Sequence, residues 1–177
     1  MKAYFSIKFV IFIVFSVLII VLRDTLLINL KYLVAALLLA FGTENIVFHA
    51  IFHQKDCIKK YQFIYGFIQL ILGFTVLFGV ESFESVCVIW GVWSISRETF
   101  EIHEIAARKV TGIVALVSAI ESIVTITFSV MLLNDPTEHH AQIHIYLLIA
   151  EFLVTAFSPV VSGFIEHYKK KNDNQIS

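Results

Sequence analysis

Cysteine, proline and charged residues are all scarce in this chain of 177 residues. It contains two cysteines, two prolines and 15% charged residues, whereas 58% of its residues are hydrophobic. Cys57 is expected in a basic loop on the cytoplasmic side and Cys87 at the outer start of a helix, so a disulfide between them is not expected. Soluble domains usually carry about 25% charged residues. The composition therefore excludes an ordinary soluble domain and favours a membrane protein.

The chain also lacks clustered positive charge and the common catalytic motifs. Its formal net charge is −1, and its longest run of basic residues is the three lysines at 169–171. Nucleic acid is therefore not an expected partner, because binding it requires a basic face. There is no Gly-rich phosphate loop, H-E-x-x-H pair or nucleophile elbow. These absences do not favour an enzyme, and no cofactor is predicted.

Apolar segments of membrane-spanning length recur along the chain. About 20 apolar residues are needed for a helix to cross roughly 30 Å of hydrocarbon. Seventeen phenylalanines and few prolines suit long helices better than the alternating strands of a barrel. We predict an all-α, polytopic membrane protein in which a single domain, residues 1–177, holds six transmembrane helices in three hairpins. The predicted helices span residues 4–22, 32–53, 61–80, 86–105, 110–133 and 143–167.

The distribution of Lys and Arg predicts how these helices are oriented. Basic residues precede the first predicted helix and follow the second, fourth and sixth, which places them on one side. The loops at 81–84 and 134–140 contain none, and only Arg23 and Lys31 depart from the pattern. Since basic loops stay inside, both ends are expected in the cytoplasm of a multi-pass protein of the bacterial cytoplasmic membrane. The lipid bilayer is the expected partner, and a second copy or another membrane protein is left open.

Several ionisable residues lie within the predicted spans. An ionised side chain near the bilayer centre costs about 2.5–3.5 kcal/mol on insertion scales. Four unpaired carboxylates would thus cost roughly 10 kcal/mol, so we expect them to be paired, protonated or in contact with water. The predicted intramembrane polar or ion site consists of Glu44, Arg97, Glu98, Glu101, Glu121, Glu151, Thr155 and Ser158.

Helical spacing predicts which side chains face the interior. Glu151 shares a face of the last helix with the hydroxyl residues that follow it, and Glu98 or Glu121 is expected to approach the same space. There Glu151 could share a proton, pair with Arg97 or take up water. Arg97 and Glu101 are four residues apart and could also pair along their own helix. The residues of the last helix that are expected to face outward are Phe152, Leu153 and Phe157.

Stripes of small and amide residues mark two further helices. The stripe of the third helix consists of Gln62, Tyr65, Gly66, Gln69 and Gly73, and that of the fifth of Ala115, Ser118, Ala119, Ser122, Thr125 and Ser129. Small residues let membrane helices pack closely, so both stripes are predicted to be packing surfaces. On the second helix, Gly42 and Asn45 share one side. The first helix is polar only at its ends and is expected to face lipid.

Two pairs of histidines could belong to a metal site. His49 with His53, and His140 with His144, are each four residues apart and could reach one ion from a single helix face. Glu138 or Glu151 could complete such a site. No E-x-x-H pair typical of a di-iron bundle is present.

The layout resembles that of a known membrane protein family. Six short-looped spans, the segment Gly66-Phe-Ile-Gln-Leu-Ile-Leu-Gly73, and the turns at 81–84 and Asp135-Pro136 resemble HdeD-type bacterial membrane proteins, which are linked to acid resistance. The resemblance implies a small six-helix membrane protein, and it brings no catalytic residues.

Together these patterns predict a membrane protein with a polar interior, lined by Glu and His, that handles protons, cations or a small cationic solute. One alternative is a non-transporting stress or scaffold protein with a paired carboxylate network. Another is a membrane-embedded enzyme that uses Glu and His as acid, base or metal ligands. A third is the substrate-binding subunit of a larger importer.

Overall fold

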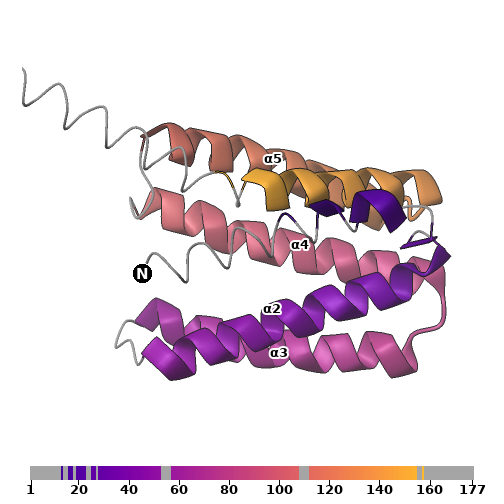
Figure 1. Ribbon diagram of the computed structural model, residues 1–177, viewed down its shortest axis with the longest axis horizontal. Coiled ribbons are helices and arrows are strands. Elements are labelled where there is room, and N and C mark those ends of the chain that lie inside the picture. The colour runs from indigo at the N-terminus through magenta and orange to yellow at the C-terminus, as the bar shows by residue number, and fades with distance from the viewer. Residues whose placement is uncertain are drawn as a thin grey trace, which may run out of the picture. The chain divides into compact units, whose positions relative to one another are not determined.

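All regular secondary structure in the described part of the chain is helical (Figure 1). The computed structural model describes residues 13, 16–17, 19–22, 25–26, 28–52, 57–107, 112–154 and 157, without the side chains of 48–52, 57–62, 104 and 113–114. The helices are α2 (Leu30–Phe52), α3 (Cys57–Gly79), α4 (Phe83–Ala106) and α5 (Gly112–Asn134). Residues 138–154 form a further helix, and residues 19–22 are helical as well. The predicted all-α class is confirmed.

Two of these helices are long and apolar enough to cross a membrane. They are the segments Leu30–Val47 of α2 and Ala115–Asn134 of α5, and Phe63–Gly79 of α3 is a shorter apolar helix. Phe63–Gly79 lies within a predicted span, and the other two segments overlap predicted spans and extend one or two residues beyond them.

Helix α4 and the 138–154 helix begin a few residues earlier than the sequence predicts, because hydroxyl side chains cap them. The Ser82 hydroxyl accepts a hydrogen bond from the Ser85 amide at 3.1 Å, so α4 begins at residue 83 and not at 86. The Thr137 hydroxyl similarly accepts one from the His140 amide at 3.4 Å. The last helix therefore starts at residue 138 instead of 143, and His140 lies in its first turn and not in a loop.

The chain forms two compact units. Unit 1 consists of residues 1–23 and 92–177, and unit 2 of residues 24–91. Helix α4 passes from unit 2 to unit 1 after Gly91.

Unit 2 is built around the α2–α3 hairpin, whose two helices run side by side (Figure 1). A Cβ atom added to Gly42 would lie 2.9 Å from the backbone oxygen of Gly66, and one added to Gly66 would lie 3.0 Å from the backbone oxygen of Gly42. Beside this contact the Asn45 side-chain amide donates to Gln69 Oε1 at 2.8 Å. The stripe on α3 is thus a packing surface, as predicted.

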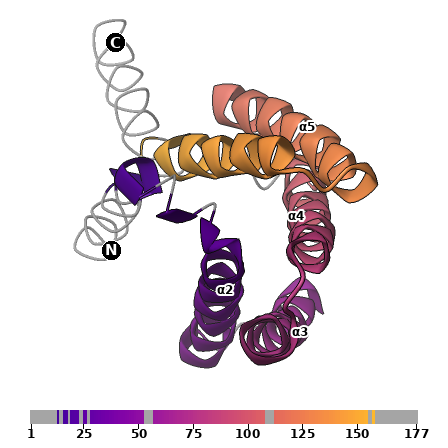
Figure 2. The same ribbon diagram turned by 90° about the vertical axis from the view of Figure 1, so that its right-hand side faces the viewer.

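In unit 1, α5 turns at residues 135–137 into the 138–154 helix, which runs back beside it (Figure 2). Helix α4 contributes the charged residues described below. Ser16 and Ile19 of the N-terminal segment are buried, whereas Val17 and Val21 are exposed. This part of the first predicted helix therefore buries one face and exposes an apolar one.

Candidate functional site

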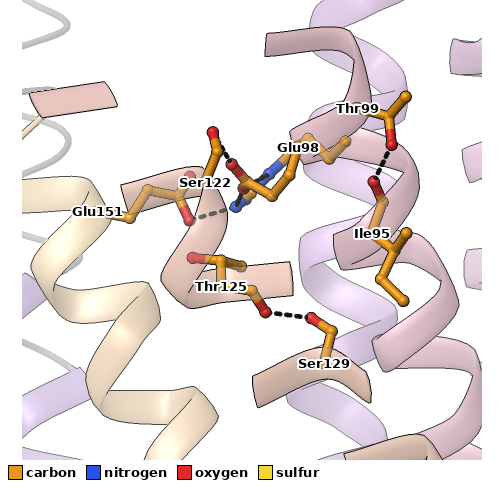
Figure 3. Close-up of polar contacts among 8 residues, drawn as sticks. Ile95, Glu98, Thr99, Ser122, Thr125, Ser129 and Glu151 are labelled. Atoms are coloured by element: carbon orange, nitrogen blue, oxygen red, sulfur yellow. Dashed lines mark hydrogen bonds and ion pairs between the residues drawn. The ribbon is translucent and has the colours of Figure 1, made fainter. Parts of the chain in front are cut away.

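The candidate site of unit 1 is centred on the guanidinium of Arg97, which pairs with Glu98 and Glu151. Figure 3 shows these two carboxylates and the neighbouring Ser122. Arg97 Nη2 donates to Glu98 Oε1 at 2.5 Å, and Nε reaches the same oxygen at 3.2 Å. Nη2 also pairs with Glu151 Oε2 on the 138–154 helix. Its Cζ atom lies 5.1 Å from the centroid of the Trp93 ring, within the range of a cation–π contact. Arg97 thereby joins two helices.

Glu98 links the same cluster to α5. Its second oxygen, Oε2, accepts a hydrogen bond from the Ser122 hydroxyl at 2.7 Å. The Glu98 side chain is 2% exposed, whereas those of Arg97 and Glu151 are each 16% exposed. Glu98 is therefore a buried carboxylate with both oxygens engaged, which is the arrangement that a charge removed from water requires. We call Arg97, Glu98, Ser122 and Glu151 the Arg97 network.

Glu121 lies at the margin of the Arg97 network. Glu98, Glu101 and Glu151 are close enough to interact electrostatically with its carboxyl group, as is Arg97. Its Oε1 atom is buried, and none of the described residues donates a hydrogen bond to it. Glu121 thus differs from Glu98, although both come from the same predicted set.

The structure distributes the other predicted site residues as follows. Glu101 is partly exposed on α4, one turn after Arg97. Glu44 is partly exposed on α2 and belongs to unit 2. Thr155 and Ser158 lie outside the described residues, as do His53 and the side chain of His49.

The remaining histidine candidates have other contacts. The His140 ring donates from Nδ1 to the Asp135 backbone oxygen at 2.7 Å, beside the Asp135 carboxylate at 3.6 Å. His144 is buried and forms a hydrogen bond with the backbone of Phe128. In the part of the chain that the structure describes, no three His, Cys, Asp or Glu residues are grouped so that they could hold a metal ion.

One expectation about the last helix needs correction. Phe152 was expected to face outward but is only 3% exposed, while Phe157 is exposed as expected. The buried face of this helix is broader than a polar stripe, because Ile145, Leu148 and Ile149 are buried on it too. The polar stripe alone does not predict that these apolar residues are buried.

No protein-family model, curated protein or solved structure matches the chain. The chemistry that the site can perform therefore follows from its own residues and contacts. Carboxylates, one guanidinium and a hydroxyl can exchange protons, attract cations or hold helices together.

The sequence analysis did not identify Ser122 as a site residue, although it placed Ser122 in a packing stripe. On α5 the buried hydroxyl residues are Ser122, Thr125 and Ser129. Ser129 donates to the backbone oxygen of Thr125 at 2.7 Å, which is local to the helix (Figure 3). The one signal in the sequence for a role in the site is that Ser122 is adjacent to Glu121.

Proposed function

We propose that the chain is a six-span protein of the bacterial cytoplasmic membrane with both ends in the cytoplasm. Apart from the two long apolar helices, exposed apolar side chains support this proposal. Ile71, Phe74 and Phe78 of α3 and Leu116, Ile120 and Ile123 of α5 are all at least 50% exposed in the isolated chain. Acyl chains would cover such surfaces, which monomeric soluble proteins avoid.

Exposed hydroxyl groups give independent support. Thr75 lies among exposed apolar residues of α3, and its hydroxyl donates to the backbone oxygen of Ile71 at 2.9 Å. Thr127 of α5 does the same with Ile123 at 2.8 Å. A hydroxyl facing lipid must find its partner within its own helix, because no water is available there.

Within this membrane protein, we propose that the surroundings of Arg97 form a site for a proton or a small cation. The observation that carries this proposal is the excess of carboxyl groups. Glu98, Glu121 and Glu151 lie around one guanidinium, and Arg97 is the only Lys or Arg whose side chain is described in unit 1. If all three carboxyl groups were ionised, negative charge would exceed positive charge in a setting of low dielectric. A bound proton or cation removes that excess.

A stress or scaffold role, like that implied by the resemblance to HdeD-type proteins, is the second candidate. It is favoured by the contacts of the Arg97 network, which joins α4, α5 and the 138–154 helix. Such a network could serve only to hold three helices together.

Flux through liposomes distinguishes the two candidates. Purified protein in phosphatidylethanolamine and phosphatidylglycerol liposomes should dissipate an imposed proton or K⁺ gradient faster than empty liposomes do. Glu151→Gln should slow this flux, and Glu84→Gln, an exposed carboxylate at the start of α4, should leave it unchanged. Flux equal to that of empty liposomes would reject transport in favour of the scaffold.

A further inference from the structure

The carboxyl oxygens around Arg97 differ in whether they have a hydrogen-bond donor. Both oxygens of Glu98 are engaged, by Arg97 and by Ser122, and Glu151 receives the second contact of the guanidinium. Glu121 Oε1 is buried with no hydrogen-bond donor among the described residues. A bare carboxylate oxygen in such a place is costly, whereas a protonated carboxyl group is much less so.

The charges around Glu121 also favour its protonated form. The charged groups that act electrostatically on its carboxyl group are Arg97, Glu98 and Glu101 of α4 and Glu151 of the 138–154 helix. Arg97, whose guanidinium is the only basic Lys or Arg side chain described in unit 1, is already paired twice, with Glu98 and Glu151. The other titratable group of that helix described in this region, His144, is bonded to the α5 backbone at Phe128. A negative charge on Glu121 is thus opposed by three like charges and balanced by one shared cation.

We propose that Glu121 is the residue that carries the exchangeable proton, with the Arg97 network as the fixed frame that positions it. This inference rests on the proposed function and names its ion. A metal ion would need several oxygen ligands, and the described residues offer no group of three that could supply them. Proton uptake forms one O–H bond on the Glu121 carboxylate and converts a hydronium ion to water. Release reverses both changes.

Infrared difference spectroscopy of the full chain in the same liposomes tests this assignment directly. Lowering the pH protonates exposed carboxylates too, and the band of interest is the C=O stretching band of a protonated carboxyl group in a buried position without a hydrogen-bond donor. Glu121→Gln should abolish this band, and Glu84→Gln should retain it. Glu121→Asp keeps a carboxyl group and should shift the band, which provides a second variant if the glutamine variant does not fold. A band that neither Glu121 variant alters would overturn the inference.

Flux separates this inference from the proposed function. If the wild type conducts protons, Glu121→Gln should lower the rate by on the order of 10²-fold. Equal flux in the variant and the wild type would overturn the role of Glu121 and leave the proposed function intact. If the wild type shows no flux but the band still depends on Glu121, transport is rejected and Glu121 remains the protonated group.

Discussion

The hydroxyl group of Ser122 makes a testable contribution to stability at the residue scale. It supplies the only contact described for Glu98 Oε2, in a side chain that is almost completely buried. Ser122→Ala should lower the free energy of unfolding by about 1–3 kcal/mol, because a buried carboxylate oxygen loses its donor. The measurement is reversible unfolding in mixed detergent micelles. Thr127→Val is the matched control, since that hydroxyl is exposed and bonds only within its own helix, and it should change stability by less than about 0.5 kcal/mol.

Arg97 should not tolerate replacement by lysine. Its flat guanidinium contacts Glu98 and Glu151 and lies against Trp93, and a lysine ammonium cannot reproduce that fork. Arg97→Lys should cost about 1.5–3 kcal/mol. Arg97→Gln should cost about 3–5 kcal/mol, because it leaves buried carboxylates without a cation. An Arg97→Lys variant as stable as the wild type in the same unfolding assay would show that the guanidinium geometry matters little at this site.

The charged residues of the Arg97 network were easier to predict from the sequence than the contacts between them. The cost of burying charge left three alternatives for Glu151, namely a shared proton, a pair with Arg97 or contact with water, and the structure shows the pair. Helical spacing pointed to Glu101 as a partner of Arg97 along α4, but it did not suggest Glu98. Adjacent residues of a helix point about 100° apart, so their contact depends on how the long arginine side chain bends. Spacing rules do not contain that information.

Close helix packing in unit 2 makes the next prediction, at the scale of elements. Gly66→Ala would place a Cβ atom 3.0 Å from the backbone oxygen of Gly42 and 3.0 Å from the Cβ of Asn45. The helices would have to separate, so the variant should lose about 1–3 kcal/mol of stability. Gly79→Ala is the matched control, because nothing lies within 4 Å of its added Cβ. If both substitutions had the same effect on thermal unfolding, the α2–α3 contact would not be tight.

The helices themselves were easier to predict than their ends. Runs of apolar residues located α2 to α5, because only long apolar helices explain such runs. The starts at Phe83 and Glu138 depended on the capping hydroxyls of Ser82 and Thr137. Those residues look like ordinary loop residues in the sequence, and hydropathy alone gives them no weight.

The orientation of the whole molecule in the proposed bilayer leads to a further prediction. The basic residues predict that both ends are cytoplasmic. A reporter enzyme that works only in the cytoplasm should therefore be active when it is fused after Lys171, and a periplasmic reporter should be inactive there. The opposite result would invert the proposed topology and place the loops at 81–84 and 134–140 in the cytoplasm.

The separation in sequence between the partners of Arg97 has a consequence for synthesis on the ribosome. Glu98 is the next residue, whereas Glu151 follows 54 positions later. When α4 enters the proposed bilayer, its arginine is thus already accompanied by a carboxylate, and the two can insert as a neutral pair at lower cost than a lone charge. The bond to Glu151 can form only after the last helix arrives. Glu98→Gln should therefore reduce the yield of membrane-inserted chain in pulse-labelled cells, and Glu151→Gln should leave insertion intact and weaken only the finished protein.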